Sequence, residues 1–503
     1  MITFLVALVV LVLGFVLYGT FVEKVFGIDP KAETPAITKN DGVDFVPMSG
    51  WRIFLVQFLN IAGLGPIFGA IMGIFFGPAA FLWIVFGTIF AGGVHDYLSG
   101  MLSLRKGGVS LPEIVGSELG SGVRVFMRVL SLVLLLLLTT TFLSGPATLL
   151  QGLAPLGTMP FHGRALPIAW VLIIFAYYAL ATVLPVDKLI GRFYPIFGGM
   201  LLFMGIGIAV VMLAKHGSAM PELTDGLYNR KADGLPIFPM MFVSIACGAI
   251  SGFHGTQSPI MSRCLTNERQ GRWIFYGAMV AEGILALIWA AAAGTFFADP
   301  EQGLDGIGGL QAFASHYDRG TNLPALIVDK VSRSWLGTVG GVLAIIGVIA
   351  APITSGDTAL RSARLIVADF LHIDQKPKMK RLMIALPLFL CVFALVFVNF
   401  EIVWRYFSWT NQTLAMFTLW AGTVWLYRNQ KSEIRNQKYS FGYLIALIPA
   451  LFMTMVSTSY IMIAPEGFRL PEQYRWIGYA IAGVITLACL CGFTFWARNY
   501  KAK

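Results

Sequence analysis

Apolar residues recur along this 503-residue chain in blocks of about 20, and this feature limits most strongly what the chain can fold into. Twenty residues of α-helix rise about 30 Å, which is the thickness of the hydrocarbon core of a bilayer. Only 12% of the residues are charged, whereas a soluble domain carries about 25%. The sequence therefore predicts an all-α polytopic membrane protein and excludes an ordinary cytosolic enzyme.

A window of about 19 residues predicts thirteen membrane spans. Their expected ranges are residues 2–22, 52–74, 79–98, 127–149, 166–185, 193–214, 236–258, 273–297, 335–355, 382–400, 403–427, 441–463 and 476–497. No positive residue precedes the first span and no small-residue cleavage site follows it, so we interpret it as a retained helix rather than a secretory signal.

Lysine and arginine are distributed unevenly between the alternate loops of this arrangement. One side collects 26 of the 36 basic residues, and such an excess marks the cytoplasmic side of a membrane protein. We therefore expect the N-terminus outside and the C-terminus in the cytoplasm. Because the basic residues are scattered through short loops, they indicate membrane orientation and not a nucleic-acid partner.

The loops between the spans are too short to hold a separate domain. The longest, residues 298–334, lies on the expected outer side, and its apolar stretch Leu323 to Val331 is expected to form a short helix over the pore. The five cysteines are odd in number and none has metal-site spacing, so we predict no disulfide framework, no metal and no cofactor. HExxH, GxSxG and Walker A patterns are absent from the sequence, which predicts no enzymatic activity.

Two of the predicted spans are interrupted by residues that weaken a helix. Span two contains Gly63-Leu64-Gly65-Pro66 near its centre, and residues 247–256 of span seven contain three glycines. Freed backbone groups are tolerated in lipid where they line a cavity or bind a ligand, as in the broken helices of transporters. For span two the alternative is a proline kink combined with close packing, because glycines recur at positions 65, 69, 73 and 77.

The two interrupted spans are five spans apart, and because five is odd, two repeats of five spans would have opposite orientations. This pattern predicts a LeuT-like inverted 5+5 repeat with one extra helix before it and two after it. The expected parts are residues 1–50 with the extra N-terminal helix and a cytoplasmic loop, 51–215 with the first repeat, 216–430 with the second, and 431–503 with two C-terminal helices and a tail.

Ionisable side chains inside spans are costly and indicate function. Glu282 lies in the apolar centre of span eight, where desolvation disfavours the charged carboxylate, as a proton carrier requires. His254 lies beside the second break, and Asp96 follows His95 at the expected end of span three. We predict proton coupling by His254, Glu282 and Asp96. The alternatives are a structural partner for Glu282, a packing role for His254 and a solvated helix end for Asp96.

Other polar groups near the breaks are candidates for binding. The expected substrate-binding residues share a position at a break or opposite it, and they are Gly63, Gly65, Pro66, Ser251, Gly252, His254, Asn411 and Gln412. Ala62, Thr354 and Ser355 are a candidate sodium site, unless the two hydroxyls only bond to their own helix. Asp357 and Arg361 are four residues apart on one helix face and are expected to form a gating ion pair.

These segments closely resemble the carbon starvation protein A (CstA) family. The similar stretches are residues 41–47, 62–66, 246–254, 267–268, 276–279 with Glu282, 357–364 and 411–412. The resemblance implies a bacterial inner-membrane transporter of the amino acid/polyamine/organocation superfamily, which takes up peptides or pyruvate under carbon starvation, driven by protons.

The chain also departs from the family pattern around the expected site. Leu64 stands at the second place of the usual Gly-Ala-Gly-Pro, Val56 and Gln57 stand where many members have two histidines, and His95 replaces a common Gln. Gln257-Ser258-Pro259 likewise replaces a Ser/Thr/Gly-rich run. These differences leave the substrate open.

The sequence thus predicts a secondary active importer of small carboxylates, peptides or pyruvate, coupled to protons and working by alternating access. Half-helix N-termini at the two breaks would present backbone N–H groups to the carboxylate. A sodium-coupled amino-acid transporter of the same fold is the alternative. A nutrient sensor is a third reading, disfavoured because no sizeable cytoplasmic domain is predicted.

Overall fold

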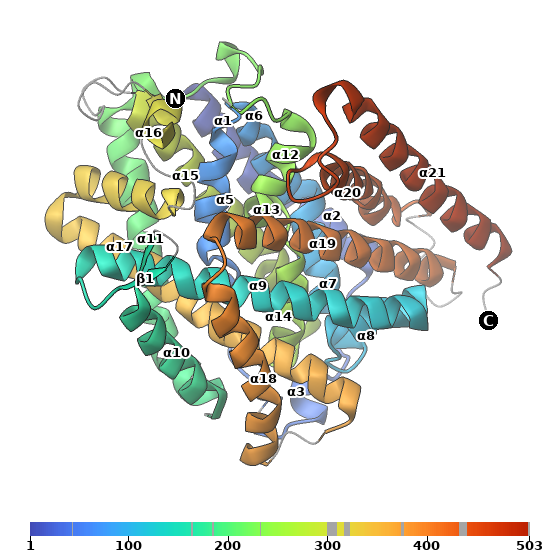
Figure 1. The fold of residues 1–503 in the computed structure, drawn as a ribbon. Helices are drawn as coiled ribbons and strands as arrows, with labels where there is room; N and C mark the ends of the chain where they lie inside the picture. Colours follow the sequence, from blue (N-terminus) through green and yellow to red (C-terminus); the bar gives the residue numbers. More distant parts are fainter. Residues whose placement is uncertain are drawn as a thin grey trace.

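The computed structural model describes residues 1–42, 44–161, 164–183, 186–231, 233–298, 309–315, 322–373, 377–431 and 440–500. Within these ranges the fold is a bundle of α-helices with one antiparallel hairpin, β1 (Met159–Phe161) and β2 (Arg164–Leu166) (Figure 1). The helical class is confirmed. The hairpin was not expected, because three-residue strands are too short for an alternating pattern to stand out.

The first six predicted spans all contain helices. They are α1 (Ile2–Leu13) and α2 (Gly19–Phe26), joined by the π-helical Gly14–Tyr18; α4 (Gly50–Ile61) and α5 (Leu64–Ile74); α6 (Ala79–Leu82) and α7 (Gly93–Arg105), joined by the π-helical Trp83–Gly92; α9 (Ser121–Leu153); α10 (Ile168–Val183); and α11 (Val186–Lys215). The connecting segments add α3 (Pro35–Thr38) and α8 (Leu111–Leu119). Gly120, with a φ of 102°, ends α8 and turns the chain into α9.

The remaining seven predicted spans also contain helices. They are α12 (Ile237–Ser244), α13 (Ala246–Ala249) and α14 (Gly252–Ser262); α15 (Gly277–Ala298), preceded by the π-helical Arg272–Tyr276; α17 (Leu323–Leu371); α18 (Lys378–Val396); α19 (Phe400–Lys431); α20 (Leu444–Ile463); and α21 (Arg475–Asn499). Outside the spans lie α16 (Gly309–Ser315) and short 3-10 turns at Gly217–Ala219, Leu223–Asp225, Glu268–Gln270 and Glu472–Tyr474.

Among the described residues, fewer helices could cross a membrane by length and composition than the thirteen spans that the sequence predicts. In the described ranges nine helices are long and apolar enough to cross a membrane, or ten if the bent pair α4 and α5 is one span. A multi-span membrane protein is therefore confirmed, while thirteen crossings stay a prediction. The short helix expected from Leu323 is present as the start of α17, which is interrupted at Gly337, where φ is 67°.

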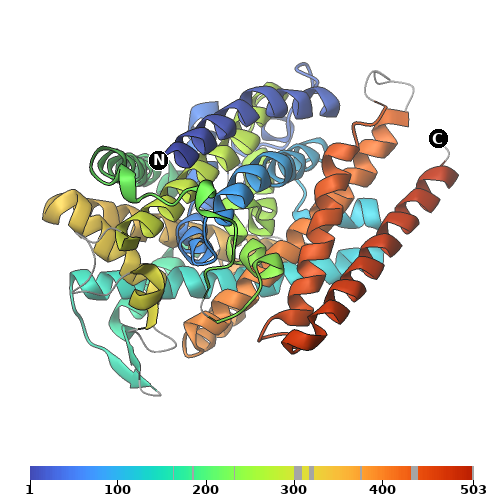
Figure 2. The same cartoon turned by 90° about the horizontal axis from the view of Figure 1, so that it is seen from above.

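Many large apolar side chains are exposed on the outside of the bundle, as expected where helices face lipid. Exposed residues of this kind on α1, α11, α18 and α21 include Val9, Ile206, Val210, Leu386, Leu390, Val484 and Leu487. The broken helices α5, α13 and α14 lie in the middle of the bundle, and α20 and α21 lie at one edge (Figures 1 and 2). Any functional site built on the breaks is therefore enclosed by helices.

Ion pairs connect the loops at the face that the sequence predicts to be cytoplasmic. Arg105 binds Glu268 with an N–O distance of 2.8 Å, and Lys106 and Arg428 bind Glu118 at 2.8 and 3.0 Å. The pairs of Arg105 with Glu268 and of Arg428 with Glu118 join segments that are far apart in the sequence, so they connect the end of α7 to the 3-10 turn Glu268–Gln270 and the end of α8 to the end of α19.

Candidate functional site

The first break separates α4 from α5 and bends the pair by 46°. Ala62 and Gly63 leave helical geometry, with ψ values of 43° and −140°, so the predicted interruption is confirmed. Its extent is smaller than expected: Leu64, Gly65 and Pro66 already form the first turn of α5. A proline is tolerated there, because the first N–H groups of a helix have no intrahelical acceptor in any case.

The second break lies between α13 and α14, where Ile250 and Ser251 have extended backbone conformations. The side-chain oxygen of Asn411 on α19 accepts hydrogen bonds from Ser251 Oγ at 3.1 Å and from the Phe253 N–H at 2.7 Å. The neighbouring Gln412 donates from Nε2 to the carbonyls of Ala246 and Ile250, at 3.0 and 3.1 Å. The structure thus uses both amides to satisfy the freed backbone of the break.

The two broken segments pack directly against each other. A Cβ at Gly65 would lie 2.3 Å from the Cβ of Cys247, and one at Gly73 would lie 2.3 Å from Ile245 Cγ1. One at Gly69 would lie 3.0 Å from the carbonyl oxygen of Ser244. Both interpretations of span two therefore hold, at different residues: the chain unwinds at Ala62 and Gly63, and the following glycines allow close packing.

Gly65→Ala is expected to destabilise the protein, because the added methyl overlaps the Cβ of Cys247 and forces the two broken segments apart. Overpacking of this kind costs about 1–3 kcal/mol. We expect a lower melting temperature of the detergent-solubilised protein, followed by size-exclusion chromatography, and partial recovery in the double variant Gly65→Ala/Cys247→Gly. Gly122→Ala is the control, since no atom lies within 4 Å of a Cβ there. Equal melting of the Gly65 variant and wild type would contradict this packing.

Four ionisable side chains form a buried chain beside the second break. His254 on α14 lies between two carboxylates: its Nδ1 is 2.9 Å from Asp96 Oδ2, and its Nε2 is 3.2 Å from Glu282 Oε2. On the far side of Asp96, Oδ1 lies 2.8 Å from Nδ1 of His95. All four side chains are 0% exposed. The three residues predicted for proton coupling are thus brought together.

The alternative interpretation of Asp96, a solvated position at the end of span three, does not agree with the structure. The helix continues seven residues beyond the predicted end at 98, to Arg105, so Asp96 lies inside it and out of contact with solvent. The sequence analysis noted His95 beside Asp96 and as a departure from the family pattern, without giving it a role, and its contact with Asp96 makes it part of the buried chain. The adjacent pair His95-Asp96 within one helical turn was the signal that pointed to it.

The geometry around His254 suits the storage of a proton. A neutral imidazole has one N–H and donates to one neighbour, whereas an imidazolium donates to two. Glu282 has no hydrogen bond in the described part of the chain, because its approach to His254 is close enough for an ion pair but poorly angled. The buried carboxylate of Glu282 would gain a hydrogen-bond partner if it took up a proton or if the His254 ring rotated slightly.

The candidate sodium residues gather at the first break. Ser355 Oγ on α17 donates to the carbonyls of Leu59 and Ala351, at 3.0 and 2.9 Å, and lies 3.4 Å from a Cβ placed at Gly63. Thr354 donates to the carbonyl of Ala351 at 2.7 Å. Hydroxyl and carbonyl oxygens of α17 and α4 therefore meet here, although both hydroxyls are engaged with backbone as in the alternative reading.

The predicted ion pair between Asp357 and Arg361 is not formed, and this expectation is corrected. Both side chains are buried on α17, but among the described residues no carboxylate lies within 4.0 Å of the Arg361 guanidinium, whose Nη2 donates to the Ala181 carbonyl at 3.4 Å. Spacing of four residues places two side chains on one face, but the rotamers decide whether they meet. A gating role of the two residues stays a proposal.

A string of buried polar side chains on α4, α14 and α17, toward the face that the sequence predicts to be cytoplasmic, was not singled out as a site. Gln57 donates to Ser258 Oγ at 3.2 Å, and Gln257 donates to Ser362 Oγ at 3.1 Å. The signal in the sequence was the departure from the family pattern at Gln57 and at residues 257–259. Side-chain hydrogen bonds thus join α4 to α14 and α14 to α17.

Comparison with known proteins assigns the chain to a family. The family model of carbon starvation protein CstA matches residues 1–162 and 158–305, which is more than half of the chain. The chain belongs to the CstA family. This confirms the resemblance seen in the sequence.

Relatives within the CstA family include named transporters. An uncharacterized membrane protein of Haemophilus influenzae is 45% identical over 350 residues, which cover 61% of this chain and 94% of the relative. The peptide transporter CstA of Campylobacter jejuni is 30% identical, with 56% of this chain and 48% of the relative covered. The pyruvate/proton symporter BtsT of Escherichia coli is 28% identical, with 61% and 51% covered. The chain spans about half the length of these two transporters.

Solved structures of a transporter share this fold at low sequence identity. Two mutants of a manganese transporter from Eremococcus coleocola match with TM-scores of 0.55 and 0.54, at 14% and 15% sequence identity. Each match covers 91% of this chain and 97% of the manganese transporter chain. At this identity the match shows a shared fold.

Proposed function

We propose that this CstA-family protein is a secondary active importer of small carboxylates, peptides or pyruvate, across the bacterial inner membrane, coupled to protons. The observation that carries the proposal is His254, which lies between two buried carboxylates directly after the second helix break. The relatives named as a peptide transporter and as a pyruvate/proton symporter support it. Transport is the activity given in the name of each, and none is named as an enzyme.

The proposal includes alternating access of two inverted five-helix repeats within thirteen crossings, with the N-terminus outside and the repeats at residues 51–215 and 216–430. Its support is the contact between the two broken segments, one from each repeat, at Gly65 and Cys247. If one repeat moves relative to the other, this contact and the hydrogen bonds of Asn411 are where the motion acts. The same fold in a manganese transporter supports a transport role for this arrangement.

The substrate carboxylate is proposed to bind at the breaks. The Phe253 N–H of the second break is engaged by Asn411, and the Gly63 N–H of the first break donates to the Ile61 carbonyl at 2.9 Å. The N–H groups of Leu64 and Gly65 stand in the first turn of α5, where no intrahelical acceptor exists, and the partial positive charge of the helix N-terminus adds to them. The first break is therefore the stronger candidate anchor.

Purified protein in liposomes tests the function directly, by uptake of labelled pyruvate or dialanine with and without an inward proton gradient. One pH unit stores about 1.4 kcal/mol per proton, which supports about tenfold accumulation at one proton per substrate. We expect this accumulation and its collapse by a protonophore. Uptake that is indifferent to the gradient would contradict proton coupling.

Sodium coupling is the second candidate, favoured by the oxygens of Ser355 and Leu59 that meet at the first break. The same liposomes distinguish it when Na⁺ is replaced by choline at constant pH. We expect no change in uptake, whereas loss of uptake in choline, together with loss in Ser355→Ala, would establish the sodium alternative.

A further inference from the structure

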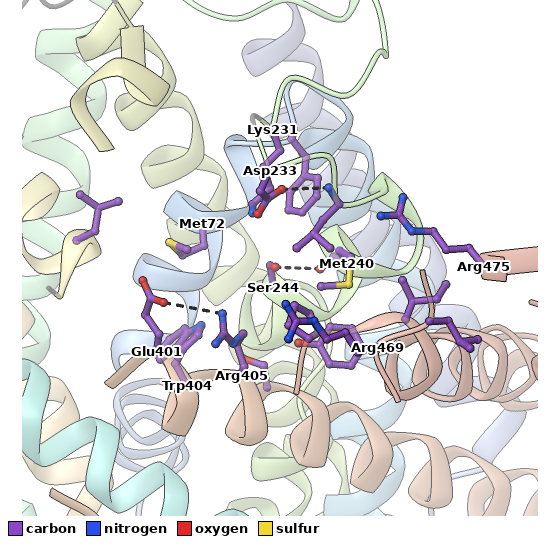
Figure 3. A pocket seen from close by; sticks show the side chains of 18 of the residues that line it. Met72, Lys231, Asp233, Met240, Ser244, Glu401, Trp404, Arg405, Arg469 and Arg475 are labelled. Atoms are coloured by element: carbon purple, nitrogen blue, oxygen red, sulfur yellow. Dashed lines mark hydrogen bonds and ion pairs between the residues drawn. The ribbon is translucent and has the colours of Figure 1, made fainter. Parts of the chain in front are cut away.

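A cavity of about 850 Å³ opens at the face that the sequence predicts to lie outside (Figure 3). It lies between α5, α12, the start of α19 and the segment that follows α20, and Leu323 and Pro324 at the start of α17 also line it. Its volume is within the range of about 300 to 1,000 Å³ that small-molecule sites occupy. None of the site residues predicted from the sequence lines this cavity.

Most of the charges that line the cavity are already paired. Arg405 lies 3.3 Å from Glu466 and 3.8 Å from Glu401, and Lys231 forms an ion pair with Asp233. Burial, and then the nearby charge of Arg405, lower the pKa of Lys231 to about 8.

Arginine 475 is engaged as well, since it lies 3.9 Å from Glu472 and donates to the Gly234 carbonyl at 3.2 Å. Arg469 differs from all of these, because it has no carboxylate within 4.0 Å and no side-chain hydrogen bond among the described residues. Arg469 is therefore the cation of this cavity whose charge is available to a ligand.

The backbone holds Arg469 in place. Its φ of 51° lies in the left-handed region, which a residue with a side chain rarely adopts. The residues on both sides are fixed to the last turns of α20: Phe468 N–H donates to the Ile461 carbonyl at 2.8 Å, and Leu470 N–H donates to the Met462 carbonyl at 3.1 Å. A strained residue between two hydrogen-bonded neighbours indicates that its backbone position, and so the point from which its side chain starts, is determined by the fold.

The cavity leads toward the second break. Ser408 of α19 lines it, is 2% exposed, and has an Oγ without a hydrogen bond in the described ranges. Asn411 lies three residues further along the same helix, a rise of about 4.5 Å. On the opposite wall Ser244 lines the cavity, and Cys247, which accepts a hydrogen bond from Asn411 Nδ2 at 3.5 Å, follows three residues later.

We propose that this cavity is an outer docking site for an organic carboxylate, which pairs with Arg469 before it passes along α19 to the second break. The site is separate from the buried chain around His254. A guanidinium that has no carboxylate partner among the described residues attracts a ligand carboxylate more strongly than an arginine that is already paired. Unpaired Ser408 Oγ offers the next polar contact inward. This inference rests on the proposed function, because it takes its ligand class from there.

The full chain with Arg469→Gln tests the docking site. In uptake experiments we expect the half-saturating concentration of pyruvate or dialanine to rise about tenfold, the effect of about 1.4 kcal/mol, with the maximal rate unchanged within twofold. The rise should shrink as salt increases, since salt screens an exposed charge. Arg469→Lys keeps the charge and should recover most of the affinity. Lys215→Gln, an exposed cation at the end of α11 that does not line the cavity, is the control and should match wild type.

Equilibrium binding of the same two labelled ligands to purified protein, at equal pH throughout, separates this inference from the proposed function. Weaker binding in Arg469→Gln supports the docking site even if uptake shows no proton coupling. Equal binding in Arg469→Gln and wild type, or no binding in wild type, overturns it. So does a fall in maximal rate at an unchanged half-saturating concentration, which would mark Arg469 as part of the moving structure.

Discussion

His254→Asn is expected to lower proton-driven uptake by about 100-fold or more, the lower end of what one proton-transferring group contributes. Asparagine keeps a donor near the position of Nδ1, so the contact with Asp96 is largely preserved. It removes Nε2, the atom that faces Glu282 at 3.2 Å, and with it the ring that joins the two carboxylates. Initial rates in liposomes with an inward gradient of one pH unit measure the effect.

The control for His254 is His216→Gln. His216 lies outside the buried chain and stacks on Trp335 at a ring-centroid distance of 5.1 Å, so we expect near-normal uptake. Both variants need the melting temperature of wild type within a few degrees, which separates loss of coupling from loss of fold. Gradient-driven uptake within threefold of wild type in His254→Asn would remove His254 from the coupling mechanism.

Glu282→Gln is expected to abolish accumulation driven by the proton gradient while substrate exchange continues. The amide has the shape of a protonated carboxyl group and cannot release a proton, so the variant is fixed in one of the two states that coupling requires. We expect net uptake to fall to the rate without a gradient. Exchange of labelled for unlabelled substrate at equal pH, which moves no net proton, should stay within about threefold of wild type.

Glu113→Gln is the matched control for this variant. Glu113 pairs with Arg128 at 2.5 Å at the predicted cytoplasmic face, and its removal affects stability rather than coupling. If Glu282 were only a structural partner of His254, Glu282→Gln would lower the melting temperature but leave the gradient dependence of the remaining uptake intact. That outcome would exclude Glu282 as the proton carrier.

Much of the site could be predicted from the sequence, because helix-breaking and charged residues are energetically costly inside a membrane. Glycine and proline inside an apolar span, and the carboxylate of Glu282, are rare enough in lipid that each marks a functional element. The interruptions at Gly63 and at Ser251 were therefore predicted correctly. The hydrogen bonds of Asn411 and Gln412 to the second break were not predicted, and the substrate-binding role expected for both residues stays a prediction.

The sequence-based predictions differed from the structure where they depended on the position of side chains in neighbouring helices. Asp96 was placed at a helix end because hydropathy falls after residue 98, yet the helix continues to Arg105 and buries it. Asp357 and Arg361 share a helix face but do not pair. Hydropathy and spacing describe one helix at a time and contain no information about the side chains of the next helix.

By itself, the sequence determined the class of the protein, the presence of helices in its apolar blocks and the two breaks, because these follow from burial in lipid and local backbone propensity. Only the tertiary structure decided that His254 meets Asp96 and Glu282 at once, since the three lie on α14, α7 and α15, separated by up to 186 positions in the chain. It alone also revealed the cavity at the predicted outer face, and Arg469 in it, which has no carboxylate partner among the described residues, because a cavity is formed by several segments whose packing no single stretch of sequence specifies.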